Sequence, residues 1–327
     1  MRRILPAVGL FFLAPLVAEF LLGNMSITML GTLIVLAPMY GGGALLIREV
    51  VRRNDRGWPT IITLGLAFGI LEEAFMTQSL FNPDYLGMNL HLLDPAYIPA
   101  LGIGGWWTVF VLMLHSVWSI SVPIALTESC VPERSTKPWL GRIGLLVVAV
   151  LFVLATISIT SFSIKQDRVH FVASMTQFVS AAVICLVVIV FAFRLPKPAE
   201  GRAPGAVPNA WLVGLISLAA GSVFLVVPNR WAWSAVMIYI TVCAGMIGAA
   251  VAWSQRSSWG GLHRLALAGG AALAYAWHAF VQNPSVGRAG TINRIGNVVF
   301  AAGAVILLFV AARRNRARQE SAKVMSA

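Results

Sequence analysis

The stretch FGILEEAFMTQSLFNPDY (residues 68–85) places two adjacent glutamates, Glu72 and Glu73, inside an apolar run that predicts a membrane helix. A charged side chain near the centre of a bilayer costs about 2.5–3.5 kcal/mol on insertion scales, so such carboxylates indicate a functional site. The whole chain has the same character, because its 327 residues are 58% apolar and 11% charged, with a mean hydropathy of +0.82. This composition excludes a soluble globular domain and a nucleic-acid binder, despite the net charge of +12. The three cysteines are scattered and form neither a disulfide framework nor a thiolate metal site.

Apolar segments of about 20 residues, the length that a transmembrane helix needs, recur along the chain. They are residues 4–23, 25–47, 58–80, 105–129, 142–163, 173–193, 211–227, 231–253, 265–282 and 296–312. Pro- and Gly-containing turns separate them. The sequence therefore predicts an all-α polytopic bundle of about ten transmembrane helices in one domain, residues 1–312, followed by a basic tail, 313–327. The Pro/Gly-rich loop 194–210 would join two sub-bundles, 1–193 and 211–312.

The distribution of basic residues orients this bundle. If the N-terminus is cytoplasmic, 19 of the 24 Lys and Arg residues lie on the cytoplasmic side, as the positive-inside rule requires. We therefore expect both termini in the cytoplasm and a multi-pass protein of the plasma (cytoplasmic) membrane. The first apolar run follows two arginines, but Glu19 interrupts it, so we interpret it as a span and not as a signal peptide.

The ionisable residues within the spans lie at similar depths. At 1.5 Å per residue, Glu19, Glu72, Glu73 and His278 lie about 20–22 Å along their helices from the cytoplasmic side, and His115 lies about 15 Å below the outer side. All five thus fall between the midplane and the outer face. This agreement predicts one polar pocket open to the outside.

These residues are the components of general acid–base catalysis on water, and we take Glu72, Glu73, His115 and His278 as the candidate catalytic residues. Helical spacing places Glu73 with Thr77, and Glu72 with Phe75 and Ser79. It also places His115 with Trp118 and Ser119, and His278 with Tyr275 and Gln282. The candidate supporting residues are Gln282, Asn283, Thr77, Gln78 and Glu19.

Aromatic residues near these positions are candidates for the wall of a substrate pocket: Phe75, Trp106, Trp107, Trp118 and Tyr275. The loop 81–104 contains no Lys or Arg and is rich in polar and aromatic residues. We expect it to cover the pocket as a lid or a substrate-facing loop.

A Glu-Glu pair on one span, a His on the next and a His on a later span resemble the CAAX-protease and bacteriocin-processing family of glutamate-type intramembrane proteases. The family motif Glu-Glu-x-x-x-Arg corresponds to Glu72 and Glu73, with Thr77 in place of arginine. Its motif Phe-x-x-x-His corresponds to His115, with Val111 in place of phenylalanine. Its motif His-x-x-x-Asn/Asp corresponds to His278, with Gln282 at the last position and Asn283 beside it.

The resemblance implies peptide hydrolysis without a metal or other cofactor. Glu73 or Glu72 would activate water with the help of His115, and His278 with Gln282 or Asn283 would stabilise the oxyanion. A zinc site is not expected, because no His-Glu-x-x-His spacing is present. The partners would be membrane lipid and a membrane-embedded peptide or lipid-like substrate.

Two other functions remain open. Protonatable carboxylates within spans also suit a proton-coupled small-molecule transporter, and the segment APMYGGGALL (37–46) would then be an unwound helix. The alternative for that segment is close packing of helices through small residues. The second function is a membrane-embedded acid–base enzyme acting on a lipid or isoprenoid, a cyclase or transferase, since a protonated carboxyl in an aromatic pocket suits that chemistry.

Overall fold

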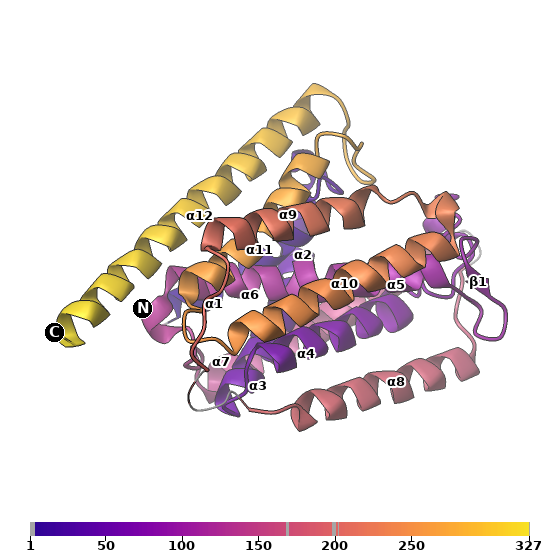
Figure 1. Ribbon diagram of the computed structural model, residues 1–327. Helices are drawn as coiled ribbons and strands as arrows, with labels where there is room; N and C mark the ends of the chain where they lie inside the picture. The colour runs from indigo at the N-terminus through magenta and orange to yellow at the C-terminus, as the bar shows by residue number, and fades with distance from the viewer. Residues whose placement is uncertain (1–3, 168–169, 198–200, 202, 327) are drawn as a thin grey trace.

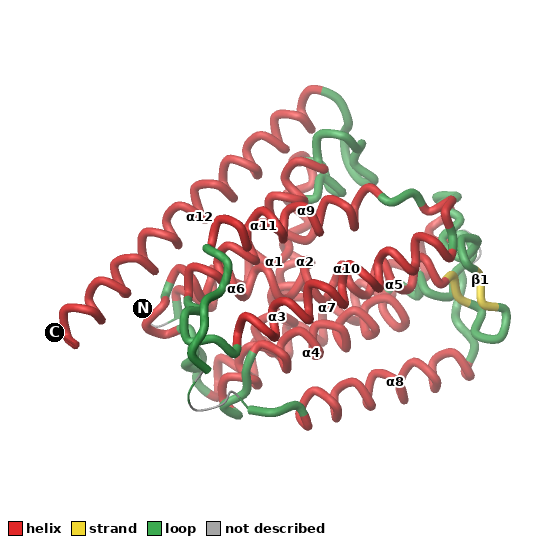
Figure 2. The backbone as a smooth tube through the Cα atoms, viewed as in Figure 1, coloured by secondary structure: helices red, strands yellow, loops and turns green. Residues whose placement is uncertain are grey.

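The structure is a computed structural model that describes residues 4–167, 170–197, 201 and 203–326. Most of its long helices run side by side, and the loops gather at their ends (Figures 1 and 2). Among the described residues, the only strands are β1 (Tyr97–Ile98) and β2 (Ile103–Gly104), which pair antiparallel in the loop that follows residue 76. The fold class is a multi-pass membrane bundle of helices.

Several helices are interrupted by turns of different pitch. The first half of the chain forms α1 (Leu5–Pro15), η1 (Leu16–Leu21), η2 (Ile27–Thr32), α2 (Leu33–Leu36), η3 (Ala37–Gly41), α3 (Gly42–Arg53), α4 (Trp58–Leu71), η4 (Glu72–Met76), η5 (Tyr85–Gly87), α5 (Gly105–Leu114), η6 (His115–Ser121), α6 (Val122–Cys130), η7 (Pro132–Arg134) and α7 (Arg142–Gln166). The second half forms α8 (Met175–Arg194), α9 (Ala210–Val226), η8 (Asn229–Trp231), α10 (Trp233–Ser254), α11 (Gly261–His278) and α12 (Thr291–Ser326). The turns η1, η3, η4 and η6 are π-helical, and η2, η5, η7 and η8 are 3₁₀-helical.

Each of the ten predicted segments coincides with a helical segment of the structure. In the described part of the chain, seven helices are long and apolar enough to cross a membrane, and the apolar helices 5–21 and 210–226 are shorter. The last helix differs from the prediction, because α12 continues through the basic residues after 312 instead of ending there. Asn315 of this extension donates to the carbonyl of Ser129 at 2.8 Å, which attaches it to α6.

Small residues set the closest helix contacts. A Cβ atom on Gly270 of α11 would lie 2.3 Å from the carbonyl oxygen of Gly214 on α9, so these two backbones touch. A buried apolar cluster joins residues of both predicted sub-bundles, among them Val17, Trp118, Phe224 and Tyr275. Packing therefore continues across the predicted division at loop 194–210. By contrast, only 11% of the apolar window of α7 and of α8 is buried, which leaves these two helices open to lipid.

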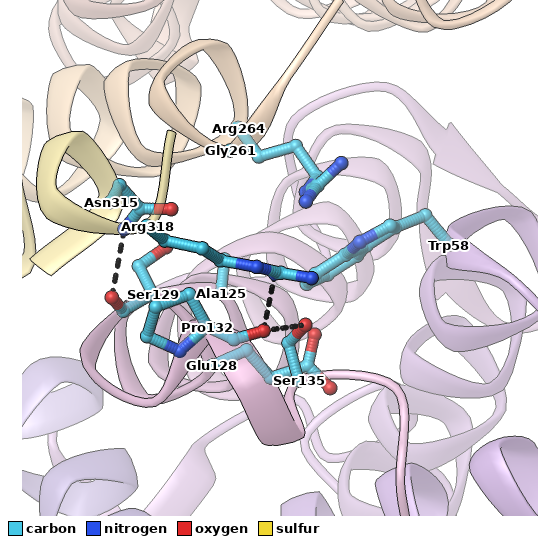
Figure 3. A pocket seen from close by; sticks show the side chains of 10 residues that line it. All are labelled: Trp58, Ala125, Glu128, Ser129, Pro132, Ser135, Gly261, Arg264, Asn315 and Arg318. Atoms are coloured by element: carbon cyan, nitrogen blue, oxygen red, sulfur yellow. Dashed lines mark hydrogen bonds between the residues drawn. The ribbon is translucent and has the colours of Figure 1, made fainter. Parts of the chain in front are cut away.

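A buried ionic cluster closes the end of the bundle where α3 ends. Glu128 of α6 accepts from Arg48 Nε at 3.0 Å and from Arg52 Nη2 at 2.7 Å, and Arg48 also donates to Glu49 at 2.9 Å. The predicted span 25–47 would leave Arg48 and Arg52 in a cytoplasmic loop, but α3 continues to Arg53 and buries both side chains. Figure 3 shows the adjoining cavity of about 10 Å³, large enough for one water, on which side chains of α6, α11 and α12 converge.

The glycines of segment 37–46 pack against neighbouring helices. The segment is helical throughout, so the expectation of an unwound helix is wrong, and the alternative of close packing is right. A Cβ atom on Gly41 would lie 1.9 Å from the backbone oxygen of Phe11 on α1, and one on Gly43 would lie 2.5 Å from the ring of Phe68 on α4.

We expect Gly41→Ala to lower the free energy of unfolding by about 2–3 kcal/mol, because overpacking against a backbone atom forces α1 and η3 apart. The matched control is Gly9→Ala in α1, where nothing lies within 4 Å of an added Cβ atom. Thermal unfolding of the purified variants in detergent measures the difference. Equal melting temperatures for the two variants would contradict the close contact.

Candidate functional site

Glu72, Glu73 and His115 lie together in the interior of the bundle. Their exposed fractions are 3%, 5% and 4%. His115 Nε2 lies 2.8 Å from Glu73 Oε1, and its Nδ1 lies 3.1 Å from Glu72 Oε2. One imidazole thus stands between two adjacent carboxyl groups, one at each ring nitrogen.

Glu72, Glu73 and His115 lie on π-helical turns, and so do Glu19 and Tyr40, which adjoin them. Glu19 belongs to η1, Tyr40 to η3, the glutamate pair to η4 and His115 to η6. The wider turn is visible in η4, where the amide of Thr77 bonds to the carbonyl of Glu72, five residues earlier, at 2.9 Å. π-Helical turns are rare and occur often at functional sites, and here four of them converge on one place.

Glu73 is fully engaged as an acceptor. Its Oε2 accepts from Thr77 Oγ1 at 2.9 Å and from the hydroxyl of Ser79, and its Oε1 contacts His115. Ser79 in turn accepts from Trp107 Nε1 at 2.8 Å. Three donors on one carboxylate favour its charged form and hold it in place. This arrangement suits a group that fixes the orientation of His115.

Tyr40 links the glutamate pair to the first span. Its hydroxyl lies 2.7 Å from Glu19 Oε1 and 2.7 Å from Glu72 Oε1, and Glu19 Oε2 accepts from Asn24 Nδ2 at 2.6 Å. A phenol has one proton to donate, so the second of these contacts is a hydrogen bond only when that carboxyl group carries a proton of its own. Both contacts are hydrogen bonds when Glu19 and Glu72 carry one proton between them.

The second oxygen of Glu72 is the uncommitted atom of the cluster. Glu72 Oε2 is buried and has no hydrogen-bond partner among the described residues. It lies within ion-pair distance of His115 Nδ1, but that nitrogen is aligned with Ser119 Oγ at 3.0 Å. A buried carboxylate oxygen without a partner is costly unless a ligand or water completes it.

Donor atoms of Glu72, Glu73 and His115 all lie within 4.8 Å of one another, which is close enough to hold a metal ion. Imidazole and carboxylate groups are both zinc ligands, and a catalytic zinc site uses three protein ligands. The motif spacing predicts no zinc site, so the geometry adds a bound metal as an alternative.

The loop 81–104 begins beside the cluster. Asn82 donates to Asp167 at the end of α7 at 2.7 Å, which anchors the start of the loop. Burial raises the pKa of the Tyr85 hydroxyl in this loop, and the charges of Glu73 and Glu72 raise that pKa further. Tyr85 is therefore within electrostatic reach of the glutamate pair, as a covering residue would be.

The structure does not bring the third predicted motif into the cluster. His278 is the last residue of α11, is half-buried, and makes an edge contact with the ring of Trp277. Gln282 donates to the carbonyl of Leu22 at 2.5 Å, and Asn283 lines a separate cavity. Among the described residues, none of these three bonds to Glu72, Glu73 or His115.

Of the other predicted residues, some reach the glutamate cluster and others pack elsewhere. Trp107 reaches the cluster through Ser79, whereas Phe75 stacks on Phe178 of α8 and Gln78 accepts from the amide of Ala173. The remaining three aromatic residues pack elsewhere: Trp106 on Phe110, and Trp118 on Tyr275 with ring centroids 4.7 Å apart.

Helical spacing did not identify Tyr40 or Asn24 as contacts of the glutamates. Ser79 was placed on the face of Glu72, but the helix ends at Met76 and the chain turns through Gln78, whose φ is 57°, so Ser79 meets Glu73 instead. A tyrosine inside an apolar, glycine-containing segment was the one signal for Tyr40.

We expect Tyr40→Phe to lower the free energy of unfolding by about 1.5–3 kcal/mol, because it removes a hydrogen bond to carboxyl groups and leaves the buried carboxyl group of Glu72 facing that of the half-buried Glu19. The control is Tyr97→Phe on the exposed strand β1, for which the expected change is below about 0.5 kcal/mol. Thermal unfolding in detergent compares the two variants. A Tyr40→Phe variant as stable as the wild type would show that the hydrogen bonds of Tyr40 to Glu19 and Glu72 do not stabilise the fold.

Comparison with known proteins gives one finding. The model of an uncharacterized membrane protein family matches residues 9–324. No curated protein and no solved structure matches the chain.

Proposed function

The chain belongs to this uncharacterized membrane protein family, and we propose that it is a membrane-embedded hydrolase of the glutamate type, related in chemistry to intramembrane proteases. One observation carries the proposal: Glu72 Oε2 is buried, accepts no hydrogen bond from any residue that the structure describes, and lies 3.1 Å from an imidazole nitrogen. A general base needs a free oxygen that is oriented by its neighbours, and Glu72 has one.

The reaction follows from the hydrogen bonds. A water bound to Glu72 Oε2 gives its proton to that oxygen as its own oxygen attacks a carbonyl carbon. A protonated His115, whose Nε2–H is held by Glu73, would share its Nδ1–H between Ser119 Oγ and the developing oxyanion. The C–N bond then breaks, and the amine leaves with the proton from Glu72. The Tyr40 hydroxyl donates to Glu72 Oε1, which leaves Oε2 as the oxygen that acts as base.

The proposal includes the membrane arrangement. We infer ten spans with both termini in the cytoplasm of the plasma membrane, on the basis of the basic-residue distribution of 19 to 5. In that orientation the glutamate pair lies in the outer half of the bilayer and the loop 81–104 on the outer side. The influence of the glutamate charges on the pKa of Tyr85 supports the role of this loop as a cover.

The lipid-facing helices next to the glutamates support a membrane-embedded substrate. A peptide or lipid-like molecule embedded in the membrane would enter from the bilayer, because α7 and α8 next to η4 present their apolar sides to lipid. We expect no cofactor and no nucleic-acid partner.

The test identifies the substrate and the chemistry together. Membranes are incubated in H₂¹⁸O with the purified wild-type protein or with Glu72→Gln, and mass spectrometry records new peptide N-termini and new lipid products. Cleavage that depends on Glu72, carries ¹⁸O in the new carboxyl group and persists with a chelator supports the proposal. Loss with the chelator and recovery with zinc would move the assignment to a metal enzyme, and the absence of any Glu72-dependent product would reject hydrolysis.

A second candidate function, a proton-coupled carrier, rests on a different observation. The chain of contacts Glu19–Tyr40–Glu72–His115–Glu73 connects four helical segments by groups that exchange protons. Proteoliposomes with an internal pH dye test this function, since substrate-driven proton uptake that Tyr40→Phe abolishes would favour the carrier. A pH that stays constant for every added solute would exclude it.

A further inference from the structure

A cavity of about 210 Å³ lies outside the glutamate cluster, between the end of α11 and the start of α12. A single water needs about 10–15 Å³ by this measure, so the cavity has room for a small organic molecule. Its polar wall consists of Gln282, Asn283, Asn293, Arg294 and Asn297. Four amides and one guanidinium on adjoining segments are more polar side chains than a solvated connection between two helices requires.

The wall is fixed by the surrounding chain. Asn297 Nδ2 donates to the carbonyl of Ala279 at 2.6 Å, and Gln282 Nε2 donates to the carbonyl of Leu22 at 2.5 Å. The loop between the helices is itself held against the turn after η1, where Ser26 N donates to Val286 O at 3.0 Å. The cavity is therefore formed by held segments before any ligand enters.

One atom of this wall lacks a partner. Asn293 is 4% exposed, and its Oδ1 is buried without a hydrogen bond to any residue that the structure describes. Buried amide oxygens are almost always hydrogen-bonded in native proteins, so an orphaned one in the wall of a cavity marks the position of a ligand donor. Arg294, the next residue, is exposed and supplies a fixed positive charge beside it.

We propose that this cavity binds a small anion that also carries hydroxyl groups, with a hydroxyl donating to Asn293 Oδ1 and the anionic group on Arg294. Asn and Gln amides satisfy the remaining hydroxyls, because each amide offers both donors and an acceptor. Two sources have this chemistry: a soluble sugar or glycerol phosphate, and the glycerol-phosphate headgroup of an anionic lipid. The site goes beyond the proposed hydrolase, since in the described structure its residues do not contact Glu72, Glu73 or His115.

The experiment uses the full-length protein in detergent and in nanodiscs. Isothermal titration with sn-glycerol 3-phosphate measures binding of the soluble form, and native mass spectrometry with phosphatidylglycerol nanodiscs measures binding of the lipid form. The variants are Asn293→Leu and Arg294→Gln. The control is Arg288→Gln, because Arg288 is exposed in the same loop but is not part of the cavity wall.

We expect saturable binding of one probe by the wild type and by Arg288→Gln, weakened at least about tenfold in Arg294→Gln and in Asn293→Leu. Binding of glycerol phosphate assigns the site to a soluble ligand, and binding of phosphatidylglycerol alone with the same residue dependence assigns it to a lipid headgroup. Arg294 is exposed, so its variant folds even if Asn293→Leu does not. Absence of binding by both probes, or equal affinity in Arg294→Gln, overturns the proposal.

Discussion

Glu72→Gln lowers the rate of substrate hydrolysis about 10²–10⁴-fold, the range that a positioned general base contributes. The amide retains the size of the carboxyl group and can still bond to Tyr40, so the melting temperature changes little while turnover falls. The measurement is kcat on the peptide or lipid identified from the membrane digest, at saturating substrate.

Comparison with Glu73→Gln separates the role of the base from that of the residue that orients His115. Glu73 accepts from Thr77, Ser79 and His115, and an amide cannot accept at both positions. We therefore expect Glu73→Gln to lose stability as well as rate, whereas Glu133→Gln, the same change on an exposed residue, alters neither. If Glu73→Gln lost rate alone and Glu72→Gln kept the wild-type rate, the two roles would have to be exchanged.

Glu128→Ala destabilises the protein by about 3–5 kcal/mol, because it leaves Arg48 and Arg52 buried with their shared counter-charge removed. The control is Arg53→Ala. Arg53 also pairs with a buried glutamate, Glu49, but its side chain is 29% exposed, so the expected loss is at most about 1 kcal/mol. Equilibrium unfolding in mixed micelles gives both values. A difference below 1 kcal/mol between the variants would mean that water solvates the cluster in the native state.

Much of the fold could be predicted from hydropathy, because spans are set by the length of apolar runs. The proximity of Glu72, Glu73 and His115 could also be predicted, because ionisable side chains within a bilayer pair with one another or face water. Tyr40 could not be identified in this way, since a tyrosine in an apolar run is also common as a packing or interfacial residue.

The placement of His278 shows where motif spacing fails. Two glycines and several alanines let α11 pack backbone to backbone on α9, and the helix ends at His278 itself. Its side chain therefore belongs to the end of a helix and not to the interior face that a His-x-x-x-Asn pattern assumes. Helical register carries no information about which pair of helices packs most closely.

The π-helical turns bear on how this sequence should be compared with its relatives. In η4 the bonded partners are five residues apart, Thr77 to Glu72, where an α-helix would pair residues four apart. Deleting one residue there would restore the regular helix and leave the helix on either side on nearly the same face, because the wider turn accommodates one extra residue. A relative can therefore keep the same packing with a gap of a single residue within 72–76 or 115–121, and a search that fixes the spacing within these segments will miss it.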